Sequence, residues 1–77
     1  MDELLFNDGG LTLTKRHGRY FVRYDADAHM IVMREDEVTA SEAERLMQGE
    51  QAAYEVLLGV QRRIAAAGGD PYRSNLS

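Results

Sequence analysis

The stretch Leu11–Tyr24, LTLTKRHGRYFVRY, predicts an antiparallel hairpin. Residues 11–14 alternate apolar and hydroxyl side chains, which is the period-two pattern of a strand with one buried and one solvated face. Residues 20–24 repeat that alternation with aromatic and branched side chains. Between the two runs, Gly18 can adopt the positive φ that a tight turn often needs. We therefore expect two strands joined by a turn at His17 and Gly18.

A third strand is expected next. Turn-prone aspartates at residues 25–28 break the pattern, and the run His29–Arg34 then resumes as a strongly apolar strand. The charged residues that follow, Glu35 to Glu37, are expected in the connection from this strand to a helix. Short loops between the three strands predict an antiparallel meander.

Two helices are expected after the sheet. Thr39-Ala40-Ser41-Glu42 has the Thr-x-x-Glu spacing of a capping box, so Thr39 is the expected N-cap of the first helix. Gly49 interrupts or ends that helix. A second, longer helix is predicted from the apolar stripe Ala53, Leu57, Val60 and Ile64, and it stops at Gly68-Gly69.

These patterns predict an α+β fold, a three-stranded antiparallel meander followed by two helices packed on one face of the sheet. We divide the chain into an N-terminal segment at residues 1–10, a single domain at residues 11–68 and a flexible C-terminal tail at residues 69–77. The tail carries the only proline and has no periodicity, so we expect it to be loose unless it docks.

The composition of the chain bears on its size class, its disulfide content and its location. At 77 residues it is one small domain with a thin core, and it has no cysteine, which excludes disulfides and thiolate chemistry and suits a reducing cytosol. Acidic residues near the start, and the absence of a long apolar run, disfavour an export signal and a membrane span. We expect a soluble, cytoplasmic protein with no membrane partner.

Catalytic patterns are missing from the sequence. There is no phosphate-binding glycine motif, so no cofactor is expected. His17 and His29 are the only histidines, and a metal site would need both of them with Asp25 or Asp27. We read both as surface residues and predict no catalytic residue and no metal. The chain is therefore interpreted as a non-enzyme.

The basic and aromatic residues of the hairpin allow a different interpretation. Lys15, Arg16 and Arg19 can meet phosphates while Tyr20, Phe21 or Tyr24 stacks on bases. A nucleic-acid-binding module that uses residues 15–24 therefore stays open as an alternative. The overall net charge of −4 repels phosphate backbones. We therefore disfavour nucleic acid as the partner.

Acidic side chains dominate the chain after the hairpin, and the sequence pI is about 5.0. Exposed carboxylates can take the place of phosphates in the basic cleft of another protein. The candidate partner-binding residues, chosen by charge and expected exposure, are Tyr24, Asp25, Asp27, Glu35, Asp36, Glu37, Glu42 and Glu44.

From Leu11 to about Ile64 the sequence, above all GRYFVRYDADAHMIVMREDEVTASEAERLMQGEQAAYEVL, resembles small cytosolic immunity proteins encoded beside secreted bacterial polymorphic toxins. The likeness lies in size, acidity and a layout of strands followed by helix. The resemblance implies a protein that binds a cognate toxin domain and blocks its active site or substrate path. It transfers no individual residue role.

The expected function is that of an acidic inhibitor whose partner is a cognate toxin or another basic-surfaced enzyme. A phage-encoded inhibitor of a nucleic-acid-guided defence complex faces a similarly basic target and stays open. A homodimer that pairs through Met30–Met33 or a sheet edge is a third possibility.

Overall fold

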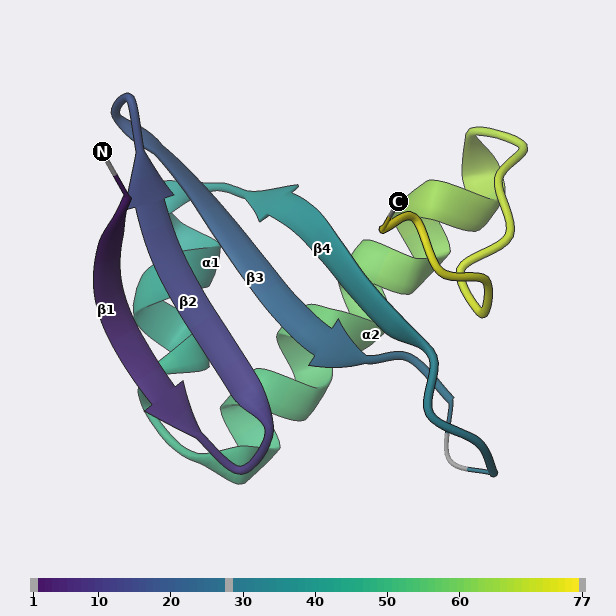
Figure 1. Ribbon diagram of the computed structural model, residues 1–77, viewed down its shortest axis with the longest axis horizontal. Coiled ribbons are helices and arrows are strands. Elements are labelled where there is room, and N and C mark those ends of the chain that lie inside the picture. Colours follow the sequence, from purple (N-terminus) through teal and green to yellow (C-terminus); the bar gives the residue numbers. More distant parts are fainter. Residues whose placement is uncertain (1, 28, 77) are drawn as a thin grey trace.

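The computed structural model describes residues 2–27 and 29–76 and has two layers, a sheet and a pair of helices (Figure 1). In chain order the elements are β1 (Glu3–Asp8), β2 (Leu11–Arg16), β3 (Arg19–Asp25), β4 (Met33–Val38), α1 (Ala40–Leu46) and α2 (Glu50–Ala66). The sheet is an antiparallel meander in the order β1-β2-β3-β4. Both helices lie behind one face of it (Figure 1). The α+β class with two helices is confirmed.

The predicted hairpin is present as β2 and β3. Arg16 pairs with Arg19 across the turn, and Leu13 pairs with Val22 further along the ladder. His17 and Gly18 have φ values of 54° and 76°, as the primed two-residue turns require. A turn of this kind matches the right-handed twist of the strands, so it fixes the register that buries Leu13 and Val22 together.

The sheet has four strands, so the expectation of three was wrong. Residues 3–8 form an edge strand, β1, within what we assigned to a separate N-terminal segment. The pairing shifts between Leu4 and Phe6, where a bulge interrupts the period-two alternation that identifies a strand in sequence. Gly9 and Gly10, both at positive φ, make the turn into β2. Asp8-Gly9-Gly10 was the available sequence signal for this hairpin.

The last strand lies further along the chain than predicted. β4 begins at Met33 and includes the charged residues that we expected in the connection to the helix, whereas residues 29–32 form a loop. This strand tolerates charged residues because it pairs with β3. The guanidinium groups of Arg19 and Arg23 on β3 form ion pairs with the carboxylates of Glu37 and Glu35 on β4. The apolar character of residues 29–32 therefore predicted the wrong position for the strand.

The core lies between the sheet and the helices. Leu13 and Val22 from the sheet, and Leu46 and Val60 from the helices, are its largest fully buried side chains. Val56 is also buried, although the predicted stripe of the second helix omitted it, and Ala53, Leu57 and Ile64 pack against the core from its margin. Within the described residues, neither helix is long and apolar enough to cross a bilayer.

The capping box that we predicted begins α1. The Thr39 hydroxyl accepts a hydrogen bond from the Glu42 amide at 3.1 Å, and the Glu42 carboxylate accepts one from the Thr39 amide at 2.9 Å. Both bonds satisfy amides that the first helical turn would otherwise leave unpaired.

Replacing Thr39 with alanine is therefore expected to lower the free energy of unfolding by about 1 kcal/mol. Urea denaturation measures the change. Ser41→Ala, at an exposed position of the same helix, is the matched control and should leave stability nearly unchanged. Equal losses in the two variants would show that the cap contributes nothing.

The C-terminal residues dock on β4. We had expected the tail to be loose unless it docked. The Asn75 side-chain amide accepts from the Glu35 amide at 2.9 Å and donates to the Glu35 carbonyl at 2.7 Å. The Ser74 hydroxyl donates to the Met33 carbonyl at 2.7 Å. The tail runs back beside β4 (Figure 1) and supplies the hydrogen bonds that a further strand would make.

Candidate functional site

A solvent-open groove runs beside α2. Its first part, of about 590 Å³, lies between the β1–β2 turn and the start of α2, and Phe6, Leu11 and Leu46 are among its apolar lining residues. A second part, of about 440 Å³, shares Tyr24, Asp25, Tyr54 and Leu57 with the first and continues along α2 to Leu58 and Gln61. We refer to the two parts together as the α2 groove.

Carboxylates border the α2 groove. Asp8 and Glu50 line its first part, Asp27 lines its second part, and Asp25 lines both. Within the described residues, none of these four carboxylates forms an ion pair. An apolar floor with unpaired acids at its rim favours a ligand that combines apolar surface with positive charge.

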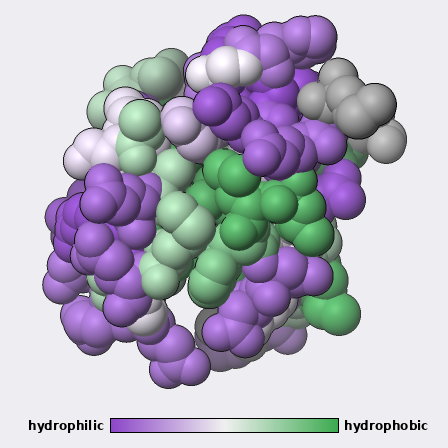
Figure 2. Space-filling view, turned by 90° about the vertical axis from the view of Figure 1, so that its left-hand side faces the viewer, coloured by the Kyte–Doolittle hydropathy of each residue, from purple (hydrophilic) through white to green (hydrophobic). Residues whose placement is uncertain are grey.

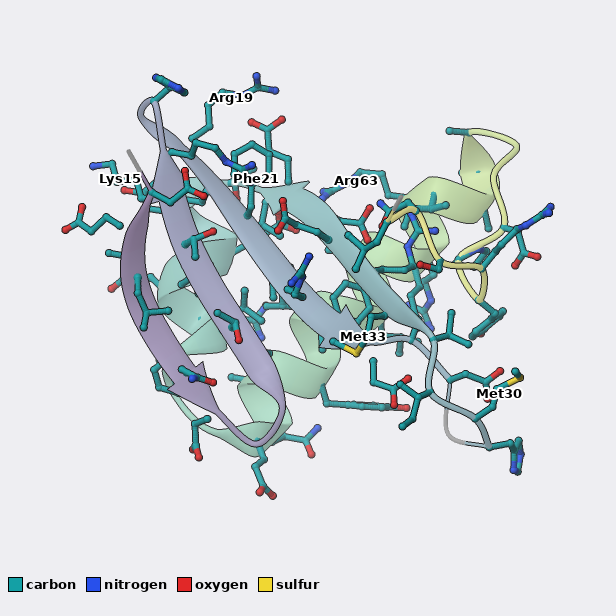
Figure 3. All side chains as sticks on the ribbon, viewed as in Figure 1. Lys15, Arg19, Phe21, Met30, Met33 and Arg63 are labelled. Atoms are coloured by element: carbon teal, nitrogen blue, oxygen red, sulfur yellow. The ribbon has the colours of Figure 1, made fainter. Side chains whose placement is uncertain are left out.

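Asp25 and Asp27 also shape the loop between β3 and β4. One oxygen of Asp25 accepts from the amides of Asp27 at 3.2 Å and Val32 at 3.0 Å, and Asp27 accepts from the amide of His29 at 2.8 Å. The loop carries Met30 away from the body of the molecule (Figure 3), and Met30 is 65% exposed. These two predicted binding residues therefore hold an apolar loop tip in place as well as bordering the groove.

Two acids of β4, Glu35 and Glu37, point to the face of the sheet that the helices leave open. Arginines of the β2–β3 hairpin pair with both. Glu35 accepts from Arg16 at 2.6 Å and lies 3.9 Å from Arg23, and Glu37 takes both nitrogens of the Arg19 fork. The hydrogen bonds from Arg19 lower the pKa of Glu37. The structure therefore brings Glu35 and Glu37 to the basic hairpin and away from the α2 groove.

Asp36 points to the other face and joins a buried polar cluster. Its carboxylate accepts from the Tyr24 hydroxyl at 2.7 Å and from two nitrogens of Arg34 at 3.0 Å. Burial raises the pKa of Asp36, but the hydrogen bonds from Arg34 and Tyr24 outweigh it, and the net pKa lies below the ordinary value. Burial, and then the hydrogen bond to the Asp36 carboxylate, raise the pKa of Tyr24.

Tyr24 was chosen as an exposed residue, but it is only 3% exposed. Tyr24 is among the lining residues of both parts of the α2 groove, and its hydroxyl donates to Asp36. Tyr24 is therefore a buried residue of the groove wall and not an exposed contact residue. Arg34, which is 7% exposed, completes the cluster by donating to the carbonyl oxygens of Asp70 and Arg73 in the tail.

The two predicted acids on α1 lie apart from the groove lining. Glu42 caps the helix and pairs with Arg63 of α2 at 3.3 Å. Burial raises the pKa of Glu42, but the hydrogen bonds from the Thr39 amide and Arg63 outweigh this effect, so the net pKa is below the ordinary value. Glu44 is exposed to solvent and has no ion pair within the part of the chain that is described.

Stability should fall in acid because the pKa values of Asp36, Glu37 and Glu42 are lower in the folded chain than their reference values of 3.8 and 4.5. In the range around and below those reference values the unfolded chain binds more protons, so their contribution is complete above about pH 5 and is lost as pH falls through the lower folded pKa values. Urea unfolding at about pH 6 and about pH 3 should show this loss.

The variant Asp36→Asn removes one of these groups and is expected to be less stable than the parent at neutral pH but to lose less on acidification. A parent chain whose stability did not change between the two pH values would contradict the assignment of these low pKa values.

The alternative nucleic-acid surface is also visible on the open face of the sheet. The Arg16 and Arg19 guanidinium groups lie 4.2 Å and 5.7 Å from the ring centre of Phe21, at the hairpin end of the sheet (Figure 3). Both guanidinium groups are already committed to Glu35 and Glu37. A phosphate would have to displace a carboxylate from each of them, which weakens this surface as a phosphate-binding site.

Part of the groove lining was not predicted from the sequence. Asp8 and Glu50 border it, and Tyr54 and Leu57 line it, yet none was among the candidate residues. Tyr54, which is 62% exposed, had a signal in its position next to Ala53 of the predicted helical stripe. Asp8 and Glu50 are far apart in sequence and line the same hollow because the β1–β2 turn lies beside the start of α2 (Figure 1).

Comparisons with known proteins match this chain to no family model, no curated relative and no solved structure. Among the described residues, no group of three histidine, cysteine, aspartate or glutamate side chains is arranged to hold a metal ion.

Proposed function

We propose that this protein is a non-catalytic, acidic binding protein that inhibits a basic-surfaced protein in the cytoplasm, in the manner of the immunity proteins of bacterial polymorphic toxin systems. The α2 groove is the proposed contact surface. Apolar side chains of the partner occupy its floor, and lysine or arginine side chains of the partner meet Asp8, Asp25, Asp27 and Glu50 at its rim. No chemical step is required of the protein itself.

The unequal pairing of the acids carries this proposal. The arginines of the sheet neutralise Glu35, Asp36 and Glu37, whereas the acids around the groove have no such partner among the described residues. Charges already paired within a protein add little to its attraction for another molecule, because a partner's cation must first displace the internal one. The unpaired carboxylates therefore supply the long-range attraction for a basic partner.

The loop tip fits the same role. Met30 and Ile31 are 65% and 81% exposed, on a loop whose base is held by the Asp25 carboxylate. Because the loop backbone is held at its base, less backbone freedom is lost when the tip binds a partner. In this proposal the tip enters an apolar recess of the partner beside the groove.

Co-expression tests the proposal. The chain is produced in bacteria together with each toxic C-terminal domain encoded in the neighbourhood of its own gene. Restored growth, together with a stable one-to-one complex of the purified proteins, is the expected result. Failure to restore growth against every such domain would overturn the immunity function.

A phage-encoded inhibitor of a defence complex would use the same groove against a different basic target. The neighbouring genes separate the two proposals, because a secreted toxin gene beside it supports immunity and phage structural genes support counter-defence.

The cluster of Phe21 with Arg16 and Arg19 keeps a second candidate, nucleic-acid binding by residues 15–24. A fluorescence-polarisation titration with single-stranded oligonucleotides at low salt tests it. Binding that is lost in the double variant Arg16→Glu with Arg19→Glu supports this candidate. Absence of binding by the parent chain, or binding that this variant retains, rejects it.

A further inference from the structure

The two edges of the sheet are treated differently by the rest of the chain. The tail covers the β4 edge, where the Asn75 amide stands in for the backbone of a neighbouring strand. β1 pairs only with β2, and no other described segment makes a backbone hydrogen bond to it. A strand that is unpaired along one side is a template for another extended chain.

Apolar side chains mark the β1 edge as a contact surface. Leu4 is 61% exposed, and Leu5 and Phe6 are half-buried. Figure 2 views the molecule from the side on which β1 lies, and strongly hydrophobic atoms gather in the middle of this face and extend to its right-hand edge, with hydrophilic atoms above and below them. Such a patch with a polar border is typical of an interaction site.

Charge determines which extended chain fits this edge. Glu3 and Asp8 lie at the two ends of β1. If a second copy paired antiparallel with Leu5 opposite Phe6, each Glu3 would lie opposite an Asp8, and like charges directly opposite each other destabilise a strand pair. A partner strand with lysine or arginine at both ends would instead meet an opposite charge at each end.

The bulge between Leu4 and Phe6 adds a geometric restriction. A bulge bends the strand and increases its local twist, which discourages the indefinite stacking of flat edges.

We propose that the β1 edge binds an extended segment of another protein as a fifth strand, apolar in its middle and basic at both ends. The backbone of the segment pairs with β1, its apolar side chains cover Leu4, and its flanking cations meet Glu3 and Asp8. This surface goes beyond the proposed inhibitory function and is continuous with the α2 groove through Phe6 and Asp8.

A defined peptide tests the inference without the unidentified partner. The probe is acetyl-Lys-Lys-Val-Thr-Val-Thr-Val-Lys-Lys-amide, titrated into the isotope-labelled full chain and followed by amide chemical shifts. Saturable shifts and slower hydrogen exchange at residues 3–8 are expected. A peptide with glutamate in place of every lysine should bind at least about tenfold more weakly, as should one that carries N-methyl groups along one edge of its backbone.

The variant Leu4→Lys places a cation at the centre of the edge and is expected to weaken binding of the lysine peptide by about tenfold or more. Because Leu4 is largely exposed, the variant should keep its fold, which the spectrum itself checks. Tyr72→Lys, at a residue of the tail that is 58% exposed, is the matched control and should bind as the parent does.

Three results would overturn the inference. The first is a lysine peptide that leaves the β1 amides unchanged, and the second is equal binding by the parent and Leu4→Lys. The third is a dimer in sedimentation that Leu4→Lys abolishes, because it would show that a second copy occupies the edge. Each can occur whether or not the chain inhibits a toxin in co-expression, so the two proposals fail separately.

Discussion

Replacing Arg34 with methionine is expected to lower the free energy of unfolding by about 3 kcal/mol. Methionine keeps much of the aliphatic bulk but leaves the Asp36 carboxylate without its cation in a site where the Arg34 and Asp36 side chains are only 9% and 14% exposed. The change also removes the donor to the carbonyl oxygens of Asp70 and Arg73 that holds the tail. Urea denaturation measures the loss.

Two further variants make this prediction sharp. In the double variant Arg34→Met with Asp36→Asn the unpaired buried charge is gone, so part of the stability lost in the single variant should return. Arg45→Ala breaks an ion pair with Glu55 in which both side chains are about half exposed, and it should cost less than about 1 kcal/mol. Equal losses for Arg34→Met and Arg45→Ala would contradict the role assigned to the buried cluster.

Leu13→Ala is expected to cost about 3 kcal/mol, because it opens a cavity at a position with no exposed surface. Leu13 pairs with Val22 on the helix-facing side of the sheet, so the space cannot be filled by solvent. Leu4→Ala makes the same chemical change at a strand position that is 61% exposed and should cost less than about 0.5 kcal/mol. A comparable loss in both variants would place the core elsewhere.

Local patterns predicted the parts of the fold that local interactions determine. The His17-Gly18 turn and the Thr39 cap each depend on residues within a few positions of one another, and both are present. β1 was missed because its bulge breaks the alternation, and β4 was misplaced because its charges are compensated only by neighbouring strands. A single-sequence pattern does not contain those cross-strand partners.

The candidate site was likewise predicted only in part, because some of its features depend on residues that are distant in sequence. Asp25 and Asp27 were identified and do border the α2 groove. Glu35, Asp36 and Glu37 were identified by the same reasoning, yet the register of β3 with β4 places arginines against them. Charge is readable from sequence, but whether a charge is paired depends on the tertiary structure. Which of the predicted acids are paired within the chain could therefore be decided only from the fold.

The docked tail illustrates a further limit of sequence patterns. Ser74 and Asn75 have no periodicity, and their hydrogen bonds reach residues of β4 that are distant in sequence. Their side chains satisfy the backbone of an edge strand, which protects that edge from other chains. This is why the two edges of the sheet differ, although neither edge is distinguishable in the sequence.

The most direct test of the central claim is the association rate of the chain with the toxic domain that we propose as its partner, measured by stopped-flow fluorescence at low and high salt. The account predicts that Asp8→Lys with Glu50→Lys slows association at low salt by about tenfold or more, with a smaller effect at high salt, whereas Glu44→Lys with Glu55→Lys, away from the groove, slows it much less. Equal rates for the groove variant and the parent, or an equal effect of the two charge reversals, would contradict the claim that the unpaired acids of the α2 groove meet the partner.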